Sequence, residues 1–491
     1  MAADKPNVLV IHADQHRFDC LNVAGNKEIK TPHIDALARD GTFHSNCFTT
    51  FPLCTPARYS LLTGLYARQH LGMTNETTLP CGIATFPRIL KQAGYKTGCI
   101  GKMHFKPTYL DVGFDLMILA EQAGPGRYDD DYHRWLMERG LVDATDMQDQ
   151  VFECRAKAPA SYREDFGSEP STLGDENYSM SWIRDRAIEV MEAWDGGGNM
   201  LMVGFIKPHH PFDVPPPWSE MYDPERLTLL PGWTDDNLSR DTRFYGGYFN
   251  NKALDPAKLK RVMAQYYASI SQIDACVGQM VAVLKKKGLY DDTLVIYTSD
   301  HGEYMGFHHM LLKGNYMYDP LVRVPLVVKY PGNARAGQRH DGLVSIIDIT
   351  ATIVDAAGCI LPRHLWAQEQ PLEDANREIV FAEDHNGNYM VRSRRHKLLW
   401  YKDAESQFLD LETDPDELEN KIADPACQAE VQRMKEALLA WLAFGARPAP
   451  HEDALAREIR APNVATGSER ASSRKRVKAW LHGQMEERRG R

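Results

Sequence analysis

Residues 7–14 read NVLVIHAD, and residues 293–300 read TLVIYTSD. Each stretch is a short apolar run that ends in an aspartate, and similar runs alternate with helical patterns over most of the chain. This alternation predicts an α/β fold with a mostly parallel central sheet. The predicted strands are residues 7–11, 95–100, 200–206, 293–298 and 325–329. The predicted helices, each with a glycine stop at its end, are residues 34–40, 86–93, 181–194 and 257–287.

Two aspartates, Asp14 and Asp300, come directly after predicted strands. In an open α/β sheet, ligands bind beyond the carboxyl ends of the strands, so both side chains are expected at one edge. Two carboxylates held close together repel each other unless a cation lies between them. Together with the next side chains, Gln15 and His301, they would suit a hard divalent cation such as Ca²⁺, Mg²⁺ or Mn²⁺. The alternative is that each aspartate only caps a following helix.

Residues 51–66, FPLCTPARYSLLTGLY, contain the next feature. Pro56 favours the first turn of a helix, so Cys54 is expected just before a helix N-terminus, where free N–H groups and the helix dipole favour negative charge. Arg58 follows about one turn later and can point back toward Cys54. This arrangement suits an anion. Two other interpretations of Cys54 stay open at this point, a buried apolar side chain and a reactive thiolate.

Composition narrows the class of protein. The 491 residues, 43% of them apolar, can form one large core and a smaller satellite domain. A formal net charge of -10 argues against nucleic acid as a partner and means that an anionic substrate needs a local cationic pocket. We see no run of ~20 apolar residues that would span a membrane and no signal peptide. The nine cysteines are scattered without a C-x-x-C pair, which argues against a disulfide framework and favours a cytoplasmic location.

Domain organisation follows from shifts in composition. The polar stretches 124–176 and 211–252 are interpreted as long insertions ordered over the site, with Trp135, Tyr132, Trp218, Trp233 and Tyr245 as aromatic side chains for a sugar or aryl ring, or for core packing. We predict a catalytic domain over residues 1–375. A small α+β subdomain, residues 376–491, follows with a strand at 379–383 and a helix at 429–444. Its basic tail from Arg457, with a cluster at 474–478, is expected to be flexible or to pack on a partner subunit of a homo-oligomer.

Residues 54–58, CTPAR, resemble the C-x-P-x-R signature of the type I sulfatases, and residues 62–64, LTG, extend the match. Other segments resemble that family in the same order along residues 7 to about 440. They are residues 101–104 (GKMH), 207–212 (KPHHPF), 299–303 (SDHGE), Lys313 before 323–325 (RVP), and 408–415 (FLDLETDP) with Glu417. The resemblance implies an alkaline phosphatase-like α/β/α sandwich.

The resemblance also implies two cofactors. A separate maturation enzyme oxidises the family's cysteine, here Cys54, to formylglycine (3-oxoalanine), whose hydrate is both nucleophile and metal ligand. The implied metal ligands are Asp14, Gln15, Cys54, Asp300 and His301. Many sulfatases have aspartate where this chain has Gln15, which removes one negative charge. Ca²⁺ is the favoured ion, and Mn²⁺ and Mg²⁺ are the alternatives.

Each remaining motif residue receives a role through the resemblance. Asp300 is expected to accept the proton of the attacking group, and Arg58 and Lys102 to hold the oxygens of the hydrated aldehyde. Lys313 and the metal would neutralise the sulfate. His209, preferred over His210, would protonate the leaving group, and His104 is the candidate base that releases sulfate and regenerates the aldehyde. Asn75 either reaches the substrate or is a turn residue, and His308 and His309 are expected to be structural.

The predicted activity is hydrolysis of a small sulfate monoester, such as a sugar, aryl or alkyl sulfate. The first alternative is a phosphonate or phosphate ester hydrolase of the same fold. Relatives with that activity commonly lack the lysine and histidine that this chain has as Lys102 and His104. The second alternative is an inactive family member that only binds ligands. It is disfavoured because every motif residue is present.

Overall fold

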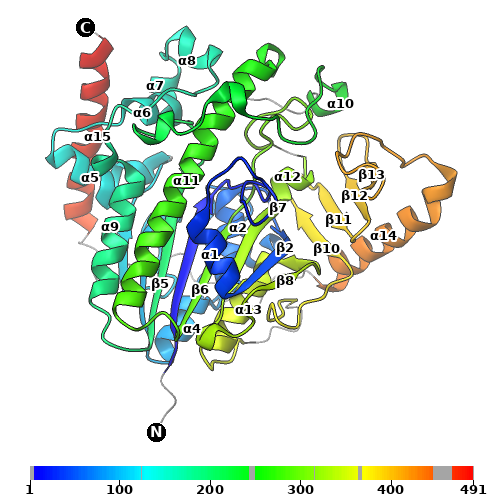
Figure 1. Ribbon diagram of the computed structural model, residues 1–491, viewed down its shortest axis with the longest axis horizontal. Helices are drawn as coiled ribbons and strands as arrows, with labels where there is room; N and C mark the ends of the chain where they lie inside the picture. Colours follow the sequence, from blue (N-terminus) through cyan, green and yellow to red (C-terminus); the bar gives the residue numbers. More distant parts are fainter. Residues whose placement is uncertain are drawn as a thin grey trace.

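The computed structural model describes residues 5–122, 124–242, 249–314, 316–362, 368–445 and 467–489. Its centre is a nine-stranded sheet (Figure 1). None of the described helices combines the length and the apolar composition that a membrane span needs. The strands, in spatial order, are β4 (Leu116–Leu119), β3 (Lys96–Gly101), β5 (Asn199–Pro208), β1 (Asn7–Asp14), β6 (Thr293–Ser299), β7 (Arg323–Lys329), β2 (Thr42–Phe48) and β8 (Gln338–His340), with β9 (Val344–Ser345) paired to β2.

Strand β1 lies in the middle of the sheet and is parallel to both neighbours, β5 and β6. Its side chains alternate between two apolar cores, with Leu9 and Ile11 in one and Val8 and Val10 in the other. Each core is covered by a layer of helices, so the protein is an α/β/α sandwich, as predicted. The helices on the Leu9 side are α1 (Pro32–Asp40), α9 (Ser179–Glu192) and α11 (Pro256–Lys286), and those on the Val8 side are α2 (Cys54–Thr63), α4 (Phe86–Gln92) and α13 (Ile346–Ala356).

The predicted strands correspond to β1, β3, β5, β6 and β7, and only Tyr95 lies outside the observed strand. The four predicted helices correspond to α1, α4, α9 and α11, with ends that differ by at most two residues. Strand β7 is antiparallel to both β6 and β2, which the apolar pattern of its sequence does not reveal. Strand β2 was not predicted. Polar residues at positions 44–46 interrupt its apolar pattern, and its pairing with β7 shifts register between His44 and Cys47.

A second, antiparallel sheet of four strands lies beside the β2 end of the main sheet (Figure 1). Its first strand contacts the segment that precedes Cys54, because the Glu383 N–H donates to the Thr50 carbonyl at 3.0 Å. The Glu383 carboxylate also accepts from Arg68 Nε at 2.7 Å. The C-terminal sheet is therefore tied directly to the segments on both sides of α2. Its elements are β10 (Val380–Glu383), β11 (Tyr389–Arg392), β12 (His396–Trp400), β13 (Gln407–Asp410) and α14 (Gln428–Ala440).

The last helix, α15 (Gly467–Arg489), does not join this sheet and lies at the other end of the molecule (Figure 1). It packs on the insertion 124–176, where Val477, Leu481 and Met485 share a core with side chains between Val142 and Cys154. The basic cluster therefore lies on a helix that is docked on its own chain, and residues 457–466 are outside the described residues. The short helices of the insertion are α5 (Asp131–Glu138), α6 (Ala144–Gln150), α7 (Phe152–Arg155) and α8 (Ala160–Glu164), and the others are α3 (Ala67–His70), α10 (Ser239–Thr242) and α12 (Asp319–Val322).

We expect removal of residues 467–491 to destabilise the insertion. The helix buries three large apolar side chains there, and each is worth about 1.5–3 kcal/mol when fully buried. Limited proteolysis should then cut first within residues 142–156, and the melting temperature should fall. Arg474→Ala is the matched control, because it removes only a partly exposed ion pair with Asp129, worth about 0–1 kcal/mol. Equal protease resistance of the truncated and full-length chains would contradict this packing.

Candidate active site

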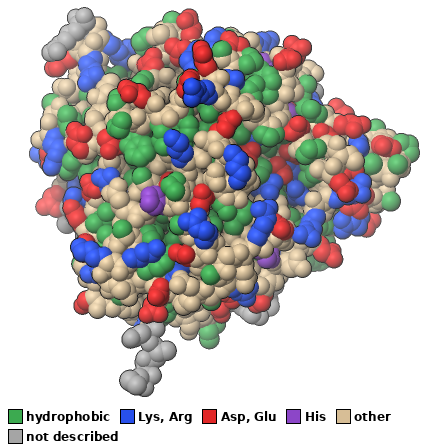
Figure 2. Space-filling view, in the orientation of Figure 1, with side chains coloured by type: hydrophobic (Ala, Val, Ile, Leu, Met, Phe, Trp, Pro, Cys, Tyr) green, Lys and Arg blue, Asp and Glu red, His purple; other side chains and the backbone are tan. Residues whose placement is uncertain are grey.

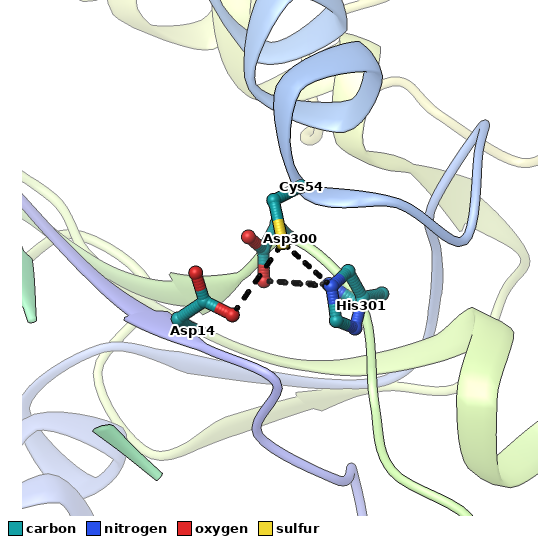
Figure 3. Close-up of side chains that lie close together, drawn as sticks. All are labelled: Asp14, Cys54, Asp300 and His301. Atoms are coloured by element: carbon teal, nitrogen blue, oxygen red, sulfur yellow. Dashed lines mark hydrogen bonds and ion pairs between the residues drawn. The ribbon is translucent and has the colours of Figure 1, made fainter. Parts of the chain in front are cut away.

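The site lies at the carboxyl ends of β1 and β6, opposite the start of α2. Asp14 is the last residue of β1, and Asp300 and His301 follow β6. Their ligand atoms and the Cys54 sulfur all lie within 4.8 Å of one another, and the four side chains are buried. Figure 3 shows that they point toward one common centre. The sequence thus predicted correctly that the two strand ends meet at one edge of the sheet.

Helix α2 positions Cys54. The chain before it is extended at Leu53, and Cys54 is the first helical residue, so the helix begins one residue earlier than the sequence predicted. Leu53 has no side-chain cap to offer. Instead, the Asn75 amide oxygen accepts the Thr55 N–H at 3.1 Å. Asn75 therefore caps the first turn of α2 next to Cys54, and its amide oxygen has a structural partner.

Arg58 bridges the two carboxylates from one turn along α2. Its Nε donates to Asp300 Oδ2 at 3.0 Å, and its Nη2 donates to Asp14 Oδ2 at 2.9 Å. Lys102, which follows β3, lies 2.8 Å from the same Asp14 oxygen. Burial would raise the pKa of Asp14, but the nearby cations, Lys102 first, outweigh burial and hold that pKa well below its usual value. Both aspartates are thus anionic, and the cations beside them are fixed in place.

Lys313 reaches the same centre from the loop after β6. Its Nζ lies 3.0 Å from Cys54 Sγ, 3.1 Å from His209 Nε2 and 3.3 Å from His301 Nε2. Burial and nearby carboxylates would raise the pKa of the Cys54 thiol, but Lys313 and His301 outweigh them and hold it well below its usual value. Acidic and basic side chains are intermixed on the face drawn in Figure 2. The cations beside Asp14 and Cys54 are Arg58 and Lys102, which are buried, and Lys313, which is partly buried.

The residues around Cys54 fit a hard divalent cation. The amide nitrogen of Gln15 donates to the Glu303 carboxylate, which leaves the Gln15 amide oxygen buried without a hydrogen-bond partner. A buried oxygen without a partner costs free energy unless a ligand satisfies it. The His301 Nδ1–H donates to the Gly302 carbonyl at 2.9 Å, so Nε2 keeps a lone pair that faces Cys54. Carboxylate and amide oxygens with one imidazole are a donor set for Ca²⁺, Mn²⁺ or Mg²⁺.

His209 is oriented by its own neighbour. Its Nδ1–H donates to the His210 carbonyl at 2.7 Å, so Nε2 faces Lys313. Burial, followed by the charge of Lys313, holds the pKa of His209 well below its usual value, so the ring is neutral. The His210 ring stacks on His209 at 4.1 Å and lies 3.5 Å from Asp149. The preference for His209 over His210 agrees with this geometry, because it is the His209 ring that contacts Lys313.

His104 lies beside the first turn of α2. Its carbonyl accepts the Thr55 hydroxyl at 2.9 Å, and its N–H donates to Glu121 at 2.9 Å. Its backbone has a positive φ of 57°, and its Nδ1 is buried without a partner. Glu121 also accepts the N–H of Met103 at 3.0 Å, so one carboxylate shapes this turn. The sequence analysis did not identify Glu121 and Glu303 as site residues. Glu121 holds the backbone of His104, and Glu303 holds the Gln15 amide, so each affects the site only through another residue.

The other predicted residues take part in packing. His308 bonds Asp241 at 2.9 Å, and the His309 Nδ1–H donates to the Thr234 carbonyl at 3.0 Å, so both hold loops together. Four of the five predicted aromatic side chains of the insertions also contact other side chains of the protein, and the fifth, Tyr245, is outside the described residues. Tyr132 and Trp135 contact Trp182, Trp233 stacks on His309, and Trp218 donates to Asp175.

Comparison with known proteins identifies the family of this chain. The sequence profile of the family described as Sulfatase matches residues 6–359. This chain belongs to the sulfatase family. A second profile, described as N-sulphoglucosamine sulphohydrolase, C-terminal, matches residues 306–443 of the sulfatase. The resemblance predicted from the motifs is therefore confirmed over most of the chain.

Individual relatives agree. The sulfatase is 29% identical over 469 residues to an arylsulfatase of Clostridium perfringens, covering 89% of this chain and 94% of that one. It is 28% identical over 494 residues to a multifunctional alkaline phosphatase superfamily protein of Trinickia caryophylli, covering 89% and 95%. A phosphonate monoester hydrolase of Agrobacterium radiobacter has the same fold, with a TM-score of 0.74, 24% identity and coverage of 89% and 96%. The protein is a sulfuric ester hydrolase with the alkaline phosphatase-like fold.

Proposed function

We propose that this sulfatase cleaves a sulfate monoester with a formylglycine made from Cys54 and with one divalent cation bound beside it. The observation that carries the proposal is the meeting of Asp14, Cys54, Asp300 and His301 within 4.8 Å. The free amide oxygen of Gln15 completes the ligand set. Ca²⁺ is favoured, with Mn²⁺ and Mg²⁺ as the alternatives, because most of the donors are oxygens. When bound, the cation and the hydrated aldehyde would supply the Lewis acid and the nucleophile.

Three cationic side chains of the site would stabilise negative charge on the hydrated side chain of residue 54 and on the sulfate. Arg58 and Lys102 lie on the carboxylate side of residue 54, where they would hold the oxygens of the hydrated side chain. Lys313 contacts residue 54 from the His209 side, where it would pair with the sulfate oxygens. Such preorganised charges are worth most in a buried site, where water does not screen them. Asp300, next to residue 54, would accept the proton of the attacking group.

Protonation of the leaving group falls to His209 together with Lys313. The neutral His209 ring accepts at Nε2 a hydrogen bond from the Lys313 ammonium at 3.1 Å, so the proton between the two nitrogens is initially that of Lys313. Its passage to Nε2 would leave Lys313 neutral and make His209 the acid. That proton is available to the oxygen that departs from sulfur. His104, next to Thr55 at the start of α2, would act as the base for release of sulfate.

The substrate is proposed to be a small sulfated sugar, aryl or alkyl compound. Relatives described as an arylsulfatase and an N-acetylglucosamine-6-O-sulfatase support this class. A formylglycine-generating enzyme is the required partner. A cytoplasmic location is proposed because all nine cysteines are free, which suits a reducing compartment.

Paired kinetics on 4-nitrophenyl sulfate and a phosphonate monoester test the proposal. The matured enzyme should have the larger kcat/KM on the sulfate. A much larger kcat/KM on the phosphonate would instead make it a phosphonate hydrolase, an activity named for one structural neighbour. Mass spectrometry of the Cys54 peptide is the companion measurement. A peptide that keeps its thiol after coexpression with a maturing enzyme would favour an inactive binding protein.

A further inference from the structure

A single buried amide connects the two halves of the site. Gln122 follows β4, just before the insertion 124–176, and is fully buried. Lys102 Nζ donates to its Oε1 at 3.2 Å. Its Nε2 donates to the His210 carbonyl at 2.9 Å and to Asp146 Oδ1 at 2.9 Å. Gln122 therefore contacts a lysine on the nucleophile side and the backbone that holds His209.

The orientation of this amide is unambiguous. A lysine ammonium only donates, whereas a carbonyl and a carboxylate only accept, so the oxygen must face Lys102 and the nitrogen must face His210 and Asp146. Both N–H groups and the oxygen are thus used. The residue itself is fixed, because Arg127 Nε donates to the Gln122 carbonyl at 2.8 Å and also pairs with Asp146. An amide with all its hydrogen bonds made in a buried network is well suited to hold other groups in place.

The His210 carbonyl decides which nitrogen of His209 can act. It accepts the His209 Nδ1–H at 2.7 Å and the two amides of Gln122 and Gln150 at 2.9 and 3.1 Å. As long as Nδ1 donates to this carbonyl, Nε2 is the nitrogen that faces Lys313. If the carbonyl turns away, the ring loses the bond that fixes its tautomer and its angle.

We propose that Gln122 is a positioning residue that holds the His210 carbonyl and thereby aims His209 Nε2 at the leaving group. This inference rests on the proposed role of His209 as the residue that protonates the leaving group. Gln122 reaches His209 through the His210 carbonyl and contacts Lys102 directly, so its effect on the reaction acts through these two residues.

The test is the dependence of rate on the leaving group. An alkyl sulfate needs its leaving oxygen protonated, whereas 4-nitrophenyl sulfate expels a stabilised phenolate and needs little help. For Gln122→Met, kcat/KM on the alkyl sulfate should fall about tenfold or more, within the range that a displaced general acid produces. Its kcat/KM on 4-nitrophenyl sulfate should fall severalfold less. A merely structural role would lower both values by the same factor, and that result would overturn the proposal.

Two further variants keep the test decisive. Gln150→Met removes the second amide from the His210 carbonyl and leaves Lys102 untouched, so it should change the ratio of the two rates in the same direction. If Gln122→Met does not fold, Gln150→Met alone still tests whether the His210 carbonyl positions His209. Gln272→Met is the matched control, because Gln272 is a buried amide of α11 that donates to Asp175. Its ratio should equal that of the wild type.

His209→Gln separates this inference from the proposed function. If His209→Gln changes the ratio and both Gln122→Met and Gln150→Met leave it unchanged, the positioning role is wrong and the role of His209 stands. If His209→Gln leaves the ratio unchanged, the proposed role of His209 is wrong, and the positioning role is overturned with it. Parallel changes in His209→Gln, Gln122→Met and Gln150→Met are the expected result.

Discussion

Cys54→Ala is expected to abolish turnover of sulfate esters, with a loss on the order of 10⁴–10⁶-fold, as when other enzymes lose their nucleophile. The Cys54 sulfur is where Asp14, His301 and Lys313 converge. An alanine cannot be oxidised to an aldehyde, so the proposed nucleophile would not form. The surrounding charges remain, and they alone can give only the residual rate that binding and electrostatic stabilisation support.

The measurement is kcat/KM on 4-nitrophenyl sulfate after coexpression with a formylglycine-generating enzyme. Cys276→Ala is the matched control, because Cys276 is equally buried but lies in the core, where burial raises the pKa of its thiol to about 12. The control should retain wild-type activity although its melting temperature falls. Full activity with alanine at position 54 would show that the nucleophile lies elsewhere.

Asp14→Asn should weaken binding of the divalent cation by at least about 100-fold. Loss of a residue that only hydrogen-bonds a metal ligand already lowers metal affinity by about 10–100-fold. The substitution removes one of the two buried negative charges that make the pocket attractive to a cation. It also leaves Arg58 and Lys102 with less counter-charge, because both pair with this carboxylate. Activity should fall together with metal affinity.

Titration calorimetry with Ca²⁺, Mn²⁺ and Mg²⁺ measures the affinity. Asp274→Asn is the control, because Asp274 is a buried carboxylate that accepts the N–H groups of His33 and Ile34 at the start of α1. That variant should lose stability but bind the cation as tightly as the wild type. Wild-type affinity in Asp14→Asn would place the cation outside this pocket.

The meeting of Asp14 and Asp300 at the carboxyl ends of the strands could be predicted because the signals for it are local in the sequence. The apolar runs before Asp14 and Asp300 mark strands, and parallel strands bring their ends to one edge. Lys102, Lys313 and His209 are different, because nothing local distinguishes them from ordinary polar residues. They became candidates only through the resemblance, and the structure brings Lys102 to Asp14 and both Lys313 and His209 to the same centre.

The positions of Gln122 and α15 could not be predicted in the same way. Gln122 lies in a loop just before a polar insertion without periodicity. Its partners, Lys102 and the His210 carbonyl, lie 20 and 88 residues away in the sequence, after β3 and β5. Helix α15 reads as a basic tail because its apolar residues, Val477, Leu481 and Met485, are few. Only the packed structure reveals that they cover the insertion. Contacts between remote segments depend on tertiary packing, which local patterns do not encode.

The central claim is that residue 54, once oxidised, and one divalent cation occupy the same pocket. Anomalous diffraction from crystals of the matured enzyme grown with Mn²⁺ tests it most directly. The account predicts one strong peak among Asp14, Gln15, Asp300 and His301, in contact with an oxidised side chain at position 54. A peak elsewhere, or a pocket filled only by the Lys313 ammonium, would contradict it.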